Sequence, residues 1–187
     1  MANTREYYAE QLDLLLCSTR RQGVTDLVKY IHECGFLNAP CSGGYHLSMA
    51  GGLLQHSINV YNVAHSLNSC LDTDITEDSI ILVSLLHDLG KAGDFGKPNY
   101  TPNILKSGEQ SRAKPYETNK DLLPVPHEVR SVALCKQFIR LTEEEEFAIL
   151  CHNGLYGDMR NVIKGNETPL YLILHMADMW ASRVMED

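Results

Sequence analysis

The sequence predicts an all-α fold in a single domain. Apolar residues recur at helical spacing along most of the 187 residues, and no stretch shows the sustained alternation of a half-buried strand. Hydrophobic residues make up 44% of the chain and charged residues 21%, which is the composition of a globular protein with a buried core. We therefore expect a helical bundle, whose elements follow from local patterns.

The first half of the chain predicts four helices. Thr25 is the expected N-cap of the second, and a glycine-punctuated loop at 38–52 leads into the third. The fourth is apolar almost all round, so we expect it to lie at the centre of the core. The expected spans are residues 5–18, 25–34, about 53–69, and a fourth helix from the N-cap Thr76 to a stop at Gly90.

Residues 91–126 have a different composition from the rest of the chain. Five of the seven prolines lie here. From 91 to 120 there are six Lys and Arg against three Asp and Glu, a local charge of +3 in a chain of −8. This composition predicts a long loop. A connection of this length without regular structure is usually functional or mobile.

Helices are expected again at 127–140, after Thr142 and from Thr168 to about Arg183. Thr142 and Glu145 match a capping box, and the run of glutamates there suits a helix N-terminus better than a cation site. Residues 1–35 are expected to form N-terminal helices packed on a domain of residues 36–187.

Composition also limits the partners and the location of the protein. A formal charge of −8 argues against binding to long duplex nucleic acid. No apolar run approaches the ~20 residues of a membrane span. There is no signal-peptide pattern, and the six cysteines are scattered without metal-type spacing. We expect a cytoplasmic protein with reduced thiols and no membrane contact.

Histidine and aspartate residues occupy unusual places on the predicted helices. His56 lies on the inward stripe of its helix, where a lone histidine is more often a satisfied core residue than a ligand. His87 and Asp88 are adjacent at the end of the most apolar helix, and burying this pair requires partners or a metal ion. An Asp–His hydrogen bond that closes the helix is the alternative. Asp178 is likewise a carboxylate inside an apolar helix.

His127 begins one further helix and His152 ends another. Together with the helices of His56, of His87 and Asp88, and of Asp178, five separate helices each offer nitrogen or oxygen ligands. This mixture suits a transition-metal or magnesium site better than a closed structural zinc site, which is usually rich in cysteine. Local spacing does not show that these residues meet.

Two segments resemble a known family. Residues 45–57 (YHLSMAGGLLQHS) and 85–91 (LLHDLGK) resemble the HD-domain superfamily of metal-dependent phosphohydrolases. The first segment is similar to that of bacterial three-to-five exoribonucleases, with Gln55 and Ser57 as departures. The resemblance covers about residues 36–185 and implies a single-domain HD-type helical bundle. Those exoribonucleases carry an additional oligonucleotide-binding domain, which we do not expect in a chain of this length.

The resemblance also implies roles for the ligand residues. Binuclear members of the superfamily use two additional histidines to bind a second ion. For this chain the resemblance implies that His127 and His152 would bind that second ion and that Asp88 would bridge the two ions. The implied metals are one or two divalent ions, with Mn, Fe, Ni, Zn and Mg all open. Asp88 would also orient the attacking water, and Lys91 would stabilise charge on the phosphoryl group, although the helix dipole alone accounts for a lysine there. The implied ligands of the first ion are His56, His87, Asp88 and Asp178.

We expect a hydrolase of a phosphate monoester or diester, with a nucleotide or a related small phosphorylated metabolite as substrate. The alternatives are a nuclease for short single-stranded oligonucleotides and a non-catalytic HD module that senses a nucleotide. The sequence also leaves open whether the protein forms a homo-oligomer. The basic and aromatic residues of the loop suit a phosphate and a base, although a solvated loop would have the same composition. The expected substrate-binding residues are His46, Lys97, Arg112, Lys114, Tyr116 and Arg160.

Overall fold

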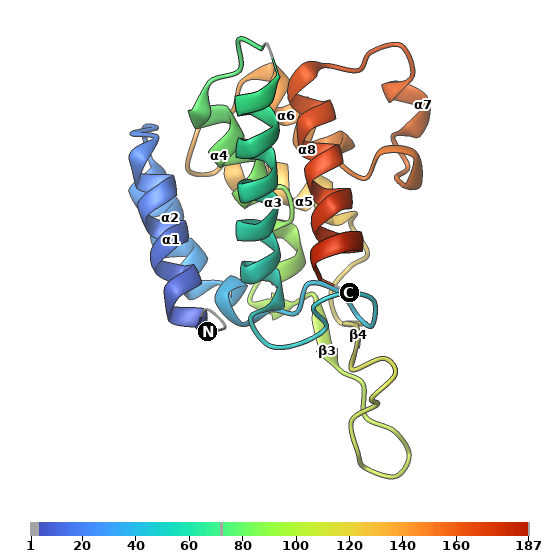
Figure 1. Ribbon diagram of the computed structural model, residues 1–187. Coiled ribbons are helices and arrows are strands. Elements are labelled where there is room, and N and C mark those ends of the chain that lie inside the picture. Colours follow the sequence, from blue (N-terminus) through green and yellow to red (C-terminus); the bar gives the residue numbers. More distant parts are fainter. Residues whose placement is uncertain (1–3, 72, 187) are drawn as a thin grey trace.

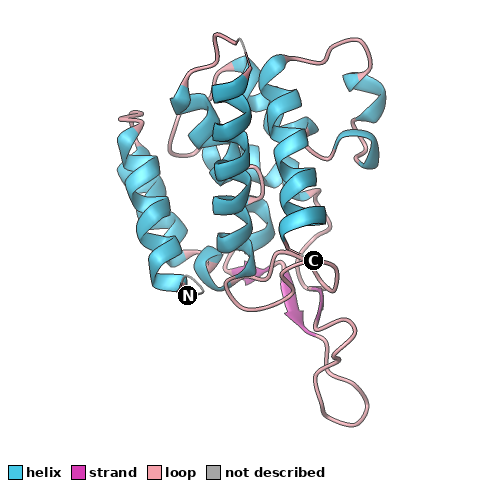
Figure 2. Ribbon diagram, viewed as in Figure 1, coloured by secondary structure: helices cyan, strands magenta, loops and turns pink. Residues whose placement is uncertain are grey.

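Helices form the body of the protein, and two short hairpins lie at one end of it (Figure 1; Figure 2). The computed structural model describes residues 4–71 and 73–186. The helices are α1 (Arg5–Ser18), α2 (Val24–Glu33), α3 (Gly52–Cys70), α4 (Glu77–Leu86), α5 (His127–Cys135), α6 (Glu143–Cys151), α7 (Arg160–Ile163) and α8 (Pro169–Trp180). Tighter or wider turns are η1 (Phe36–Asn38), η2 (Leu89–Ala92), η3 (Gly154–Tyr156) and the π-helical η4 (Ala181–Met185). The predicted all-α class is confirmed.

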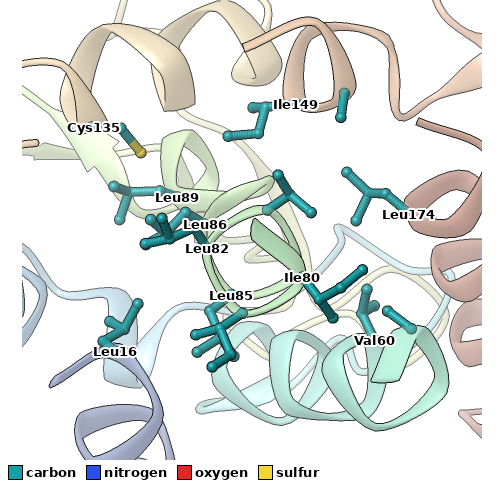
Figure 3. Close-up of a cluster of buried hydrophobic side chains, with 14 of the residues drawn as sticks. Leu16, Val60, Ile80, Leu82, Leu85, Leu86, Leu89, Cys135, Ile149 and Leu174 are labelled. Carbon is teal, nitrogen blue, oxygen red and sulfur yellow. The ribbon is translucent and has the colours of Figure 1, made fainter. Parts of the chain in front are cut away.

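Helix α4 is the centre of the bundle, as its all-round apolar sequence predicts. Its residues from Ile80 to Leu86 are buried, and α3, α1, α6 and α8 pack around it. Figure 3 shows its leucines among side chains from the surrounding helices, including Leu16, Val60 and Leu174. A helix that is apolar on every side is stable only when every side is covered. Within the described residues, no helix is long and apolar enough to cross a membrane.

The N-terminal helices share this core. Leu12 and Leu16 of α1 are fully buried, and α1 packs on α3 and α4. Helix α2 begins at Val24 after Gly23, so the prediction that Thr25 is its N-cap was wrong. Gly23 has φ +86°, and a Cβ there would lie 2.0 Å from the carbonyl oxygen of Phe138, so the chain needs a glycine at this reversal. The boundary between residues 35 and 36 stays a prediction.

The segment 91–126 contains four short strands rather than loop alone. They are β1 (Gly93–Asp94), β2 (Lys97–Pro98), β3 (Tyr100–Pro102) and β4 (Tyr116–Thr118). Strand β1 pairs antiparallel with β2, and β3 pairs antiparallel with β4, with Tyr100 opposite Thr118. Strands of two or three residues are too short to produce a detectable alternation. Residues 103–115, here called the arm, project from the end of the bundle (Figure 1).

The end of α4 is built for a close approach to α5. The α-helix ends before His87 rather than at Gly90, and η2 continues it as a tighter turn. The backbone N–H of Gly90 donates to Ser131 Oγ at 2.8 Å. A Cβ at position 90 would lie 2.2 Å from the carbonyl oxygen of His127, so only glycine fits. This approach brings the first residue of α5 to the end of the central helix.

Candidate metal centre

Six residues from five separate segments of the chain meet at one end of the bundle. Four of them are buried with at most 1% of the residue exposed: His56, His87, Asp88 and His152. The side chains of Asp178 and His127 are partly open, at 20% and 25% exposure. The six come from α3, the end of α4, the start of α5, the end of α6 and the last turn of α8.

The two carboxylate oxygens of Asp88 face different histidines. Its Oδ2 lies 3.3 Å from His87 Nε2 and 3.7 Å from His56 Nε2. Its Oδ1 lies 3.1 Å from His127 Nε2 and 3.5 Å from His152 Nε2. Asp88 therefore stands between two pairs of imidazoles.

Asp178 completes the first of these groups. Its Oδ1 lies 3.2 Å from His56 Nε2. One ligand atom each from His56, His87 and Asp178 can be chosen so that all lie within 4.8 Å of one another, and the same holds for His87, Asp88 and His152. These are spacings that one ion can span.

The imidazoles are held with Nε2 toward the centre. His87 Nδ1–H donates to the carbonyl oxygen of Ser84 at 2.9 Å, and His152 Nδ1–H donates to that of Ile149 at 2.7 Å. A carbonyl accepts only, so these bonds place a proton on Nδ1, and the neutral form of each ring then presents an unprotonated Nε2. Histidine ligands of metals are typically held in this way.

Several atoms at the centre lack a protein partner. Among the described residues, the buried atoms His56 Nε2, His87 Nε2 and Asp88 Oδ1 have no aligned hydrogen bond, despite their close neighbours. Orphaned polar atoms in a protein interior are costly and rare. Imidazole nitrogens and carboxylate oxygens are ligands that divalent transition metals accept, so the residues present fit a metal ion.

Burial and neighbouring charges shift the pKa values at the centre in two directions. They favour the ligand forms of Asp88, His87 and His127, whereas, against the effect of burial, Cys41 and Asp178 hold the pKa of His56 above its ordinary value and Asp88 does the same for His152. Burial alone raises the pKa of Asp88, but Lys91, with Nζ 2.6 Å from Oδ2, and the nearby imidazoles hold that pKa well below its ordinary value. Burial lowers the pKa of His87 and that of His127. At neutral pH the carboxylate is thus ionised and these two imidazoles are neutral, as metal ligation requires.

The centre opens into a cleft of about 440 Å³. Lys91 and His46, both predicted site residues, lie in it. So do residues that sequence reasoning missed, notably Arg183 and the buried Cys41, whose Sγ lies 3.9 Å from His46 Nε2. Scattered cysteines gave no signal, because only the fold brings Cys41 to the histidines. The cleft is lined by Cys41, Ser42, Tyr45, His46, Lys91, Tyr100, His127, Asn153, Ser182 and Arg183.

The other predicted substrate-binding residues do not line this cleft. Lys114 and Tyr116 line a neighbouring cavity of about 390 Å³, which shares Tyr45 and Tyr100 with the cleft. Lys97 donates to the carbonyl oxygen of Asp121 and lines a third cavity, of about 630 Å³, which shares Lys91 and Tyr100 with the cleft.

Arg112 is exposed on the arm, and Arg160 is exposed at the start of α7. The hydrogen bonds and ion pairs of the described residues join neither of them to the six ligands. The substrate-binding roles of these residues, and of Lys97, Lys114 and Tyr116, stay predictions.

Comparison with known proteins gives no match: no family model matches the sequence, and no curated protein or solved structure is significantly similar to it. The class of the protein therefore rests on the fold and the site. It is a helical protein with a buried cluster of histidine, aspartate and cysteine residues that could hold metal ions.

Proposed function

We propose that the protein is a metal-dependent hydrolase of phosphate esters, of the HD-domain type. The observation that supports this most is the division of the histidines between the two oxygens of Asp88. His56 and His87 face Oδ2, whereas His127 and His152 face Oδ1. A carboxylate that bridges two ligand sets is the arrangement that a two-ion hydrolytic site needs.

Bound here, one or two divalent ions would supply Lewis acidity and lower the pKa of a water molecule to near neutrality. The chain itself contributes a fixed negative charge at Asp88 and, in His87 and His127, neutral imidazoles as ligands. Lys91 Nζ is held by Asp88 and lines the cleft, where its charge stabilises a phosphoryl oxygen.

The cleft favours a small substrate. Its volume of about 440 Å³ is at the scale of a small-molecule site, and it presents two cations, Lys91 and Arg183, beside two aromatic rings, Tyr45 and Tyr100. Cations suit a phosphate and aromatic rings suit a base, so a nucleotide or a related small phosphorylated metabolite is the proposed substrate.

A nuclease that acts on short single-stranded oligonucleotides is the second candidate. The neighbouring cavity with Lys114 and Tyr116 shares Tyr45 and Tyr100 with the cleft, so a second nucleotide would find a basic and aromatic surface beside the first. A panel of mononucleotides and short oligonucleotides, compared by kcat/KM, separates the two candidates.

Metal reconstitution tests the proposal. We expect metal-free protein to bind Mn²⁺ or a similar ion and then to hydrolyse a generic phosphate monoester or diester. Asp88→Ala should lose both metal and turnover. Asp13→Ala is the matched control, because Asp13 is an exposed carboxylate that also pairs with a histidine, His32. Wild-type protein that binds no metal, or full turnover in Asp88→Ala, would refute the proposal. Metal binding without hydrolysis of any substrate in the panel would favour the non-catalytic sensing module.

A further inference from the structure

Glu186 is a buried carboxylate beside the metal centre, outside the six ligands. Its side chain has no exposed surface. It accepts hydrogen bonds from His46 Nδ1 at 2.6 Å, from His56 Nδ1 at 3.0 and 3.1 Å, and from Asn59 Nδ2 at 2.9 Å. One carboxylate thus binds three N–H groups, two of them on imidazoles at the centre.

These bonds set the orientation of His56. An ionised carboxylate can only accept, so Nδ1 carries a proton and Nε2 is the ring nitrogen that remains for a metal ion. That Nε2 lies 3.2 Å from Asp178 Oδ1 and 3.7 Å from Asp88 Oδ2, on the side of the ligand cluster. Glu186 binds Nδ1 of His46 in the same way, and His46 Nε2 lies 3.9 Å from Cys41 Sγ.

His56 differs from the other oriented histidines in where its partner comes from. His87 and His152 donate to carbonyl groups three residues earlier in the chain, which their own helices hold in place. His56 depends on a side chain 130 residues away in sequence. The orientation of this ligand therefore requires the segment after α8 to be docked on α3.

The backbone after α8 explains how Glu186 reaches α3. The α-helix ends at Trp180 and continues as the π-helical turn η4, which packs on both α8 and α3. A π-helical turn is rare and is often found at functional sites. Ser182 and Arg183 of η4 line the cleft, so the turn that leads into Glu186 also forms part of the cleft wall.

We propose that Glu186 is a positioning residue for the metal centre: it holds His56 in the Nδ1–H tautomer and couples docking of the C-terminal segment to metal affinity. The inference rests on the metal binding of the proposed function, but not on hydrolysis. Partners of this kind typically contribute 10–100-fold to metal affinity.

Metal titration of Glu186→Gln tests this role, since the change keeps the shape of the side chain and removes its charge. We expect the affinity for the first ion to fall about 10–100-fold. Glu77→Gln is the matched control, because Glu77 accepts from His65 Nδ1 at 2.8 Å on the exposed surface. It should bind metal as the wild type does. Circular dichroism and thermal unfolding would show that both variants are folded.

A second measurement needs no variant. Long-range ¹H–¹⁵N NMR of the Zn²⁺-loaded wild type should show His56 protonated at Nδ1 and bound to metal through Nε2. Ligation through Nδ1 would overturn the inference, as would unchanged metal affinity in folded Glu186→Gln. If the wild type binds no metal at all, the metal site of the proposed function fails as well, so the two failures are distinguishable.

Discussion

Gly90→Ala is the most informative single change, because Gly90 lies where the central helix meets α5. A Cβ at this position would lie 2.2 Å from the carbonyl oxygen of His127 and 2.9 Å from Arg130 Cβ. Ordinary contact begins at 3.4 Å, so the start of α5 would have to move away by about 1.2 Å. Gly90 does not have a positive φ, so backbone strain adds nothing to this cost.

We expect two consequences of this shift. Overpacking of this kind costs about 1–3 kcal/mol of unfolding free energy, against roughly 0.4–1 kcal/mol gained because alanine makes the unfolded chain less flexible. His127 would move with α5, away from its 3.1 Å approach to Asp88 Oδ1. Ligand distances in metal sites tolerate only about ±0.2 Å, so the second ion should be lost while the first is retained.

Denaturant unfolding and metal analysis after dialysis measure the two consequences separately. Gly96→Ala is the control, because a Cβ there meets nothing within 4 Å but the residue has φ +69°. It should lose about 1–2 kcal/mol through backbone strain alone and keep the metal content of the wild type. Full metal content in Gly90→Ala would refute the argument that this close approach places His127.

Three further predictions concern stability and metal binding. Glu145→Gln should cost about 1–3 kcal/mol, because Glu145 is a buried partner of Arg21 at 2.8 Å. Burial raises the Glu145 pKa, but its hydrogen bonds, led by that from Arg21, hold it below its ordinary value of 4.5. The stability gap to the wild type should therefore be full above that value and narrow as pH falls through the folded pKa, as thermal unfolding between pH 7 and 3 will show. Leu85→Ala should cost about 2–5 kcal/mol in denaturant unfolding, because Leu85 is fully buried in α4. The exposed Leu123→Ala should be nearly neutral, and equal losses would count against α4 as the core. Chelation of metal-loaded protein should lower Tm, and adding Mn²⁺ back should restore it; an unchanged Tm would mean that the native state binds no ion tightly.

Local patterns were sufficient for most of the helices. Thr76 and Thr142 cap α4 and α6 as predicted, because each cap is a hydrogen bond to a residue three positions later. No local sequence pattern predicts the pairing of Tyr100 with Thr118. Strands this short form only when their backbones hydrogen-bond to each other in the folded chain. The prediction that Thr25 caps α2 was wrong because the close approach of Gly23 to the carbonyl oxygen of Phe138 determines where α2 begins.

The candidate site also has one part that local sequence patterns predict and another that they do not. The sequence by itself determined where the longer helices form, though not the short α7, and which of their residues are out of place, because periodicity, caps and a buried His–Asp pair are properties of neighbouring residues. Only the tertiary structure decided that the two oxygens of Asp88 face different pairs of histidines, and that Glu186 lies against His56. Those contacts join residues up to 130 positions apart. They depend on how α3, α4, α5 and the segment after α8 pack around one core, and no local pattern encodes that packing.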